Sequence, residues 1–415
     1  MKKIPIIFFL ILISGVISAQ NAAPIYRMII KGGHVIDPKN NIDDIMDVAI
    51  LDGKIAKVAK DIDTSLARQI VHANGMYVTP GLIDIHAHVF YGTEPDRYLS
   101  NSFMAPRPDG FTFRSGVTTV VDAGGAGWKS FDQLKKNVID QSRTRVLSFL
   151  NIVGQGMRGG YWEEDIGDMA IEMAAKTALE NKEYIVGFML AQPKKADWIP
   201  VQKVVEAGKL ADMPVMVDLG EANLPIEDLF SKYLRPGDIY THVFAELKER
   251  DPIVDLQTRQ LKPFIIPAQK KGIIFDLGFG SSHFDFRQAI PAIKAGFLPN
   301  TMGTDLYTGS MNGAMKDELN VLSTFLAMGL TLPQVISRSA WEPAQAIKRE
   351  DLGNLSEGSV ADIAVLSLRQ GKFGFRDTAG ERLAGDQRLE CQLTIKGGQV
   401  VYDLNAIAVF RWRNR

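Results

Sequence analysis

Apolar runs of strand length alternate with amphipathic segments through the middle of the chain. The intervening segment IPVQKVVEAGKLADM places Val201, Val204 and Val205 on one helical face. Eight strands that each precede a helix-capable stretch favour an α/β fold, a closed (β/α)8 TIM barrel, over an open sheet. The eight runs, in chain order, are GLIDIHAH, TTVVDAG, RVLSFLN, YIVGFML, PVMVDLG, IYTHVF, IIFDLGFG and TMGTDL.

The two ends of the chain carry a different pattern. Residues 26–77 read as short strands separated by Gly, Pro and Asn, without a helix-length periodic run. Near the C-terminus, TIKGGQVVYD echoes the N-terminal IIKGGHVIDP, which suggests matching strand-turn-strand units. We therefore expect a small β-sandwich domain built from both termini, residues 24–78 and 346–404, beside a barrel of residues 79–345.

The first 19 residues predict a cleaved signal peptide. Lys2 and Lys3 precede an apolar run over residues 4–16, and Ala19 offers a small residue for cleavage. The run is short for a membrane span, so we expect no stable membrane anchor after cleavage; an uncleaved anchor is the alternative. The pattern predicts a periplasmic or secreted bacterial protein.

Charge and cysteine content narrow the choice of partner. The chain has 47 basic and 48 acidic residues, so no excess of positive charge favours nucleic acid as a partner. Cys391 is the single cysteine and cannot form an internal disulfide. We expect a small-molecule partner; the oligomeric state stays open, a homo-oligomer included.

Histidines and carboxylates stand at the predicted strand ends. Side chains two apart on a strand share a face, so Asp84, His86 and His88 point the same way. His242 and Asp305 lie near the C-terminal ends of the sixth and eighth predicted strands, where barrel sites form. Histidine and carboxylate side chains are common ligands of zinc, so these residues are candidate zinc ligands. For any one alone, a hydrogen-bonded core residue is the alternative.

The stretches that hold these residues resemble a known family. TPGLIDIHAHV, SGVTTVVDAG, GDIYTHVF, TDL and LGNLSEGSVADIAVL are similar to the amidohydrolase superfamily, within it the amidohydrolase/deacetylase metallohydrolases related to dihydroorotase and adenine deaminase. The resemblance spans nearly the whole mature chain. It implies a distorted barrel that hydrolyses amide or ester bonds with one or two divalent metals, commonly zinc. It also implies His86, His88 and His242 as ligands, and Asp305 as both a ligand and the general base.

Three positions depart from the family pattern. Met189 stands where two-metal members have a bridging lysine, and a thioether is a poor substitute for that bridge. Asp218 replaces a histidine ligand of the fifth strand and remains a candidate metal ligand. Tyr307 follows Asp305 in TDLY and can donate a hydrogen bond to an oxyanion. We expect one ion rather than two, most suitably Zn²⁺, with Mn²⁺ as the alternative.

Two loop residues are candidates for substrate binding. Arg158, in GQGMRGGYWEED, can recognise a carboxylate; a solvated loop charge is the alternative. His283 ends the loop DLGFGSSH, which we expect to form a wall of the substrate site, with the loop surface as the alternative position for this histidine. The loop is not a dinucleotide-binding fingerprint, because His283 stands where the third glycine would be.

Two functional interpretations follow. The first is a hydrolase of small acylated molecules that acts through a metal-activated water. The second is a degenerate barrel that kept the fold and became a binding protein, for which Met189 is the main support. The retained histidines and Asp305 favour the hydrolase, because buried polar ligands left without a partner cost about 1–3 kcal/mol each.

Overall fold

The computed structural model describes residues 25–95 and 97–409. The predicted signal peptide, residues 1–19, lies outside them and stays a prediction. Across the described ranges, no helix combines the length and the apolar character needed to cross a membrane.

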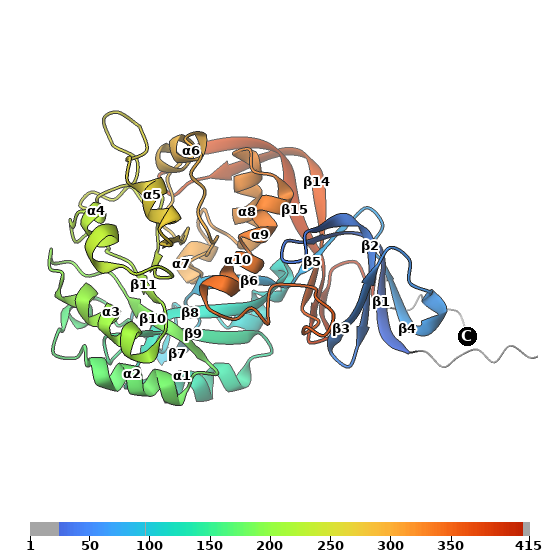
Figure 1. Ribbon diagram of the computed structural model, residues 1–415, viewed down its shortest axis with the longest axis horizontal. Coiled ribbons are helices and arrows are strands. Elements are labelled where there is room, and N and C mark those ends of the chain that lie inside the picture. The colour runs from blue at the N-terminus through green and yellow to red at the C-terminus, as the bar shows by residue number, and fades with distance from the viewer. Residues whose placement is uncertain (1–24, 96, 410–415) are drawn as a thin grey trace, which may run out of the picture.

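A curled parallel sheet forms the larger part of the molecule (Figure 1). Its strands follow the first seven predicted runs, and each strand pairs with the next along the chain, which is the topology of a barrel. In the order in which the chain visits them, the strands are β6 (Leu82–Ala87), β8 (Val117–Gly127), β9 (Arg145–Asn151), β10 (Ile185–Leu190), β11 (Val215–Val217), β12 (Ile239–Tyr240) and β13 (Ile274–Phe275).

Residues 301–306 close the ring between the two edge strands. Thr301 bridges Asp276, directly after β13, and Leu306 bridges Ala87 at the end of β6. The His88 N–H also donates to the Leu306 carbonyl at 2.8 Å. The eighth run therefore occupies the predicted place, although it forms isolated bridges rather than a regular strand. The predicted α/β barrel with a separate sheet is confirmed.

Helices surround the barrel. In α3, the predicted stretch forms a helix because Val201, Val204 and Val205 bury one face, and the helix ends at Asp212 in the left-handed conformation. The helices are α1 (Phe131–Asn137), α2 (Ile171–Glu180), α3 (Ile199–Ala211), α4 (Ile226–Asp228), α5 (Ile265–Lys270), α6 (Phe286–Lys294), α7 (Thr308–Met311), α8 (Glu318–Ala327), α9 (Leu332–Ser337) and α10 (Trp341–Ala346). Single turns are η1 (Thr64–Leu66), η2 (Pro108–Gly110), η3 (Phe113–Ser115), η4 (Ile139–Gln141), η5 (Gly160–Glu164) and the π-helical η6 (Leu229–Tyr233).

Strands from both chain ends form the second sheet. β5 pairs with β14 on one side and with β1 on the other, which joins the N-terminal and C-terminal parts, blue and red in Figure 1. Its strands are β1 (Tyr26–Asp37), β2 (Ile42–Leu51), β3 (Lys54–Ala59), β4 (Ala67–His72), β5 (Tyr77–Pro80), β14 (Ile363–Arg376), β15 (Arg382–Lys396) and β16 (Gln399–Asp403). A separate short strand, β7 (Tyr91–Glu94), follows the first barrel strand.

The two echoing segments fold differently. Gly397 and Gly398 form the turn between β15 and β16, as the pattern predicts. In the N-terminal copy the prediction of a turn is wrong: β1 continues through Gly32 and Gly33, where its register with β2 shifts by a bulge. The positive φ of Gly32, 70°, absorbs the irregularity without ending the strand.

The apolar side chains of the barrel strands separate into two clusters. Ile83, Val121 and Phe149 belong to one, whereas their neighbours Val120 and Leu150 belong to the other, which packs against the helices. Because successive side chains alternate across a strand, the first cluster fills the inside of the barrel. The polar ends of the strands lie above this packed interior.

A buried carboxyl group stands at the start of α8. Glu318 is 2% exposed, and neither of its oxygens has a hydrogen-bond partner within the described residues. Burial, followed by the charges of Asp84 and Asp317, raises the pKa of Glu318 well above its usual value. Glu318 is therefore protonated in the folded state over a pH range in which the unfolded chain ionises it.

We predict that Glu318→Gln stabilises the protein more at pH 8 than at pH 5. Above the unfolded pKa of about 4.3, the folded state holds one proton more than the unfolded state, so stability falls as pH rises. The neutral amide removes that dependence, and the expected gain in unfolding free energy is about 1–3 kcal/mol at pH 8. Urea unfolding at both pH values measures it. The exposed Glu357→Gln is the matched control, and an equal response of both variants would refute the assignment.

Candidate metal centre

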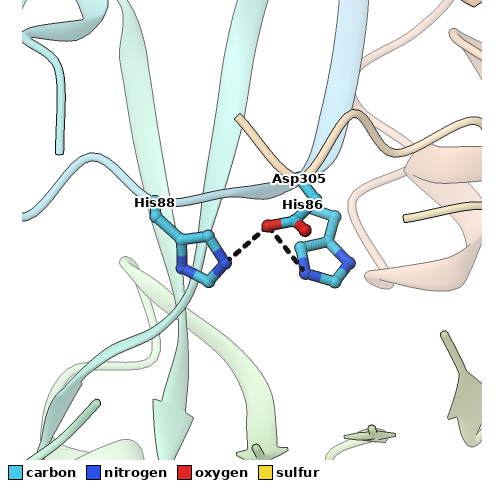
Figure 2. A group of neighbouring side chains, drawn as sticks. All are labelled: His86, His88 and Asp305. Atoms are coloured by element: carbon cyan, nitrogen blue, oxygen red, sulfur yellow. Dashed lines mark ion pairs between the residues drawn. The ribbon is translucent and has the colours of Figure 1, made fainter. Parts of the chain in front are cut away.

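His86, His88 and Asp305 converge at the C-terminal edge of the barrel (Figure 2). His86 is the last residue but one of β6, His88 follows the strand, and Asp305 comes from the closing segment. His88 Nε2 lies 2.9 Å from Asp305 Oδ1, and His86 Nε2 lies 3.8 Å from the same oxygen. All three side chains are buried. Closure of the ring thus brings together residues more than two hundred positions apart.

The far side of the His86 ring fixes its orientation. His86 Nδ1 lies 3.1 Å from Asp276 Oδ2 and 2.9 Å from the hydroxyl of Thr241, which itself donates to Asp276. Nδ1 therefore carries the hydrogen and Nε2 turns toward Asp305. Burial alone would lower the pKa of His86, but the hydrogen bond to Asp276 and the charge of Asp305 outweigh it and raise the pKa to about 9.

These donor atoms fit a divalent cation. His86 Nε2 is buried and has no hydrogen-bond partner among the residues that the structure describes. A tetrahedral zinc ion with Zn–N bonds near 2.05 Å separates its ligand atoms by about 3.3 Å, and the observed separations from Asp305 Oδ1, 2.9 and 3.8 Å, lie on either side of this value. The carboxylate behind His86 supplies the outer contact that metal-binding histidines usually have.

His242 lies beside this group, two residues beyond β12. Its Nδ1 lies 2.7 Å from the Gly278 carbonyl oxygen. Because a carbonyl oxygen only accepts hydrogen bonds, Nδ1 must carry the hydrogen, and Nε2 of the neutral ring then has a free lone pair. Burial, together with the neighbouring His283, lowers the pKa of His242 to about 3. Its backbone has a φ of 57°, a left-handed conformation that aims the ring into the centre.

His283 is part of the same buried centre. Its ring lies 3.8 Å from that of His242, and its Nδ1 lies 3.4 Å from Asp305 Oδ2. His242, His283 and Asp305 form a second group of converging donor atoms that shares Asp305 with the first. His283 is 8% exposed, so a position on the loop surface is wrong for this residue.

Asp305 connects the two groups. Oδ1 faces His86 and His88, whereas Oδ2 faces His283. Burial raises the pKa of Asp305, but the hydrogen bonds from His283 and His88 outweigh it and hold the pKa well below its usual value. The backbone φ of 53° is held by the Asp305 N–H, which donates to the His86 carbonyl, and by Ser310 Oγ, which donates to the Asp305 carbonyl at 2.7 Å.

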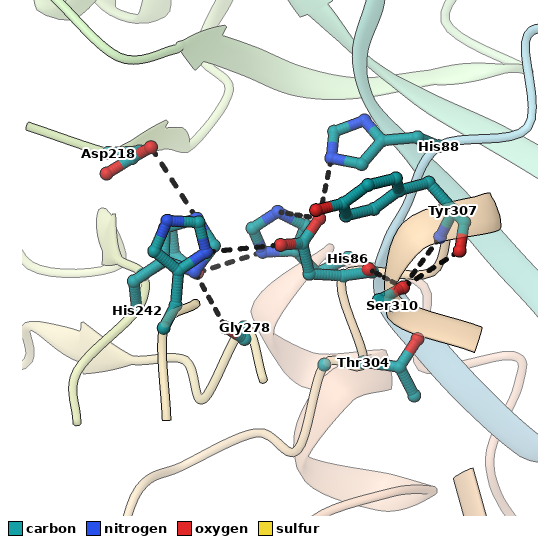
Figure 3. Close-up of polar contacts among 12 residues, drawn as sticks. His86, His88, Asp218, His242, Gly278, Thr304, Tyr307 and Ser310 are labelled. Atoms are coloured by element: carbon teal, nitrogen blue, oxygen red, sulfur yellow. Dashed lines mark hydrogen bonds and ion pairs between the residues drawn. The ribbon is translucent and has the colours of Figure 1, made fainter. Parts of the chain in front are cut away.

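Asp218 is joined to a buried arginine. Arg250 Nη1 lies 2.8 Å from Asp218 Oδ1, Arg250 Nη2 donates to the Thr241 carbonyl at 2.8 Å, and the guanidinium lies over the Tyr240 ring. Asp218 Oδ2 lies 3.5 Å from His242 Nε2 (Figure 3). Burial would raise the pKa of Asp218, but the positive charge of Arg250 and the hydrogen bond from the Gly220 N–H hold it below its usual value. Asp218 thus lies beside the centre as an ion-paired carboxylate.

A cavity of about 410 Å³ opens next to these groups. Tyr307 lines it, and its hydroxyl contacts Ser281 Oγ. Arg158 is not among the described residues that line this cavity. Its guanidinium lies over the Trp162 ring, 4.2 Å from the ring centroid. The lining residues are Tyr98, Gln192, Lys194, Gly220, Glu221, Leu247, Ser281, Ser282, His283 and Tyr307.

Met189 belongs to the apolar interior of the barrel. It is 1% exposed and packs in the same cluster as Ile85, Met157 and Tyr307. Gly124 makes room for it, since a Cβ at that position would lie 2.8 Å from Met189 Cγ. The fourth strand therefore contributes an uncharged side chain where the family pattern has a lysine.

Two residues of the centre, Asp276 and Arg250, were not predicted from the sequence. Asp276 follows β13, so the rule that sites form at C-terminal strand ends could have identified it. Arg250 lies in a loop and carries no sequence signal, because only the tertiary fold brings it to Asp218.

No protein-family model matches the chain. Among curated proteins, a dihydroorotase of Geobacter metallireducens is 37% identical, across 91% of this chain and 99% of its own length. A deacetylase of Agrobacterium fabrum is 28% identical, across 84% of this chain and 85% of its own. The crystal structure of an adenine deaminase superposes with a TM-score of 0.80 at 25% identity, covering 91% of this chain and 100% of the other.

The chain belongs to the amidohydrolase superfamily. It is an amidohydrolase-type enzyme, a metal-dependent hydrolase whose relatives include proteins named deacetylase and dihydroorotase. The buried His/Asp groups at the C-terminal edge of the barrel are the candidate sites for its divalent metal.

We predict that Arg250→Met destabilises this amidohydrolase by about 3–5 kcal/mol, because the change leaves Asp218 buried without its ion-pair partner. The double variant Arg250→Met/Asp218→Asn should recover part of the loss. Urea unfolding measures both. Arg349→Met, which breaks the exposed pair with Asp351, is the control, with an expected cost of about 0–1 kcal/mol. Equal losses for Arg250→Met and the control would contradict the argument.

Proposed function

We propose that this amidohydrolase removes acyl groups from small molecules by hydrolysis of an amide or ester bond. Relatives named deacetylase in Agrobacterium fabrum and Enterococcus faecalis support the acyl substrate. The cavity of about 410 Å³ beside the centre suits a small molecule. The alternative of a degenerate binding protein is disfavoured because the donor atoms of the centre remain in place.

The unpartnered His86 Nε2 carries the proposal. A buried imidazole nitrogen without a hydrogen bond costs free energy, and this one faces His88 and Asp305, the two partners that would complete a cation site. We propose that His86, His88 and Asp305 hold one divalent cation, most suitably Zn²⁺, with Mn²⁺ as the alternative. His242 and Asp218 would flank this site. The apolar Met189 supports one ion for catalysis, because it supplies no bridging charge.

The cation, when bound, would supply Lewis acidity, which acidifies an attacking water and polarises a carbonyl oxygen. Asp305 has an ionised carboxylate whose Oδ2 points away from His86 and His88, so this oxygen can accept the proton of that water. Tyr307 lines the cavity with a hydroxyl that stays protonated, because burial raises its pKa. That hydroxyl can donate a hydrogen bond to the oxyanion that forms from the substrate carbonyl.

We predict that Asp305→Asn abolishes hydrolysis while the fold is retained. The amide has nearly the shape of the carboxylate but accepts no proton and carries no charge for a cation. Metal content is measured by elemental analysis of tag-free protein after incubation with zinc or manganese. Hydrolysis is measured in a screen of N-acetyl and O-acetyl compounds, and the fold is checked by circular dichroism. The exposed Asp386→Asn is the control. Metal far below one ion per wild-type chain, or activity retained in Asp305→Asn, would overturn the proposal.

A separate variant tests Tyr307. Tyr307→Phe removes one hydrogen-bond donor and keeps the ring, so we expect kcat to fall by about 10²–10³, as for other oxyanion donors. Metal content should not change. Steady-state kinetics on the substrate found by the screen measures the effect, with the cavity variant Gln192→Glu as a comparison for changes in KM. An unchanged kcat would remove Tyr307 from the proposed mechanism.

A further inference from the structure

The hairpin of β14 and β15 extends beyond the sheet to which it belongs. β14 pairs with β5 over residues 363–366, whereas its pairing with β15 continues as far as Arg376 and Arg382. Residues 367–376 and 382–390 therefore form a two-stranded ribbon, which we call the C-terminal ribbon. In Figure 1 this ribbon leaves the second sheet and arches over α8 towards α6. A segment from the last part of the chain thus reaches the barrel.

Contacts with α8 hold the C-terminal ribbon against the barrel. The Leu389 N–H donates to Ser323 Oγ at 2.9 Å. Nearer the tip, the Phe375 side chain is 1% exposed. A Cβ at Gly385 would lie 2.7 Å from the Phe375 ring and 3.0 Å from Ala327 Cβ, so glycine at this position lets the ribbon lie close to the end of α8.

The turn at the ribbon tip, residues 377–381, binds the start of α6. The Thr378 N–H donates to the Phe284 carbonyl at 2.9 Å, and the Phe284 N–H donates to Thr378 Oγ1 at 3.2 Å. The Thr378 hydroxyl donates to the same carbonyl at 2.7 Å. Asp377 is completely buried, and its Oδ2 accepts from the Phe286 N–H at 3.1 Å. Within the described residues, Thr378 thus provides every hydrogen bond of the Phe284 backbone.

The segment held by the tip directly follows one wall of the cavity beside the metal centre. Residues 281–283, which we call the cavity wall, line that cavity, and Phe284 comes next in the chain. Before the cavity wall, the Gly280 N–H donates to the Thr304 carbonyl at 3.0 Å. The cavity wall is therefore held by the closing segment at its start and by the C-terminal ribbon at its end.

Two phenylalanine rings bring the ends of the cavity wall together. The rings of Phe279 and Phe284 are completely buried and stack with their centroids 4.3 Å apart. Phe284 also packs on Phe325 of α8, with the ring centroids 5.9 Å apart. Because close-packed rings transmit a shift of one to its neighbours, a change in the position of Phe284 would move the cavity wall.

We propose that the C-terminal ribbon shapes the substrate cavity, with Asp377 and Thr378 as positioning residues that hold the cavity wall in the geometry that binds substrate. This inference rests on the proposed function, which assigns the cavity to the acylated substrate. Asp305 is held separately, by its own hydrogen bond to the His86 carbonyl. Loosening the cavity wall should therefore weaken substrate binding more than it slows the chemical step.

Hydrogen exchange tests the hold on the cavity wall without a substrate. Thr378→Val keeps the shape of the side chain and removes the hydroxyl, so the Phe284 N–H loses its acceptor. We expect the amides of residues 279–286 to exchange about 10-fold faster, as measured by mass spectrometry of peptides. Thr378→Ser keeps the hydroxyl and should restore the wild-type rate. Thr112→Val is the matched control, because it removes a buried hydroxyl that donates to the Pro108 carbonyl at 2.9 Å, ahead of β8 and outside the cavity lining.

Steady-state kinetics on the substrate found by the screen tests the role in binding. We expect Thr378→Val to raise KM about 10-fold while kcat changes by less than about 3-fold. Thr378→Ser should match the wild type, and Thr112→Val should leave both constants unchanged. If Thr378→Val does not fold, Asp377→Asn takes its place, because its amide has one oxygen for the two N–H groups, of Phe286 and Glu381, that Asp377 accepts.

The outcomes separate this inference from the proposed function. Exchange of residues 279–286 that is equal in Thr378→Val and the wild type, or that rises equally in Thr112→Val, overturns the positioning role. Faster exchange with an unchanged KM overturns the role in substrate binding. A wild-type protein that hydrolyses no compound of the screen sinks the proposed function, and hydrogen exchange still decides whether the C-terminal ribbon holds the cavity wall.

Discussion

The backbone pairing between β6 and the closing segment is the constraint on which the centre depends. The Asp305 N–H donates to the His86 carbonyl at 2.6 Å, so an imidazole and the shared carboxylate come from two segments hydrogen-bonded to each other. Their spacing is therefore set by backbone geometry rather than by flexible loops. The left-handed φ of Asp305 persists because hydrogen bonds on both sides over-determine it, and it turns the carboxylate between the two groups of histidines.

Buried charge around the centre is compensated pair by pair. Asp276 is held by His86 and by two threonine hydroxyls, and Asp218 is held by Arg250. Asp84 accepts from the Thr304 backbone N–H at 3.0 Å and also contacts its hydroxyl, which ties β6 to the closing segment. Because each of these carboxylates has its own partners, the atoms left for a cation are imidazole nitrogens and the oxygens of Asp305.

Sequence patterns located the parts of the centre that strand geometry fixes. His86, His88, His242 and Asp305 stand at C-terminal strand ends, which the alternation of apolar runs and the barrel topology make readable. Arg250 and the burial of His283 could not be predicted, since both depend on how the loops after the sixth and seventh strands fold over the barrel. The sequence predicted the position of the eighth strand, but it did not predict that this segment forms isolated bridges instead of a regular strand. The irregularity arises where the left-handed backbone of Asp305 interrupts the pleat.

The departures from the family pattern at Met189 and Asp218, taken together with Arg250, change the distribution of charge in the centre. Relative to the family pattern, Met189 removes an anionic bridge, whereas Asp218 adds a carboxylate where a neutral histidine would be. Arg250 then cancels that added charge within a buried pair. The half of the centre near His242 is left close to neutral, while the half near His86 keeps Asp276 behind it and Asp305 in front. This asymmetry of charge, rather than the loss of one ligand, favours a single tightly bound cation at His86, His88 and Asp305.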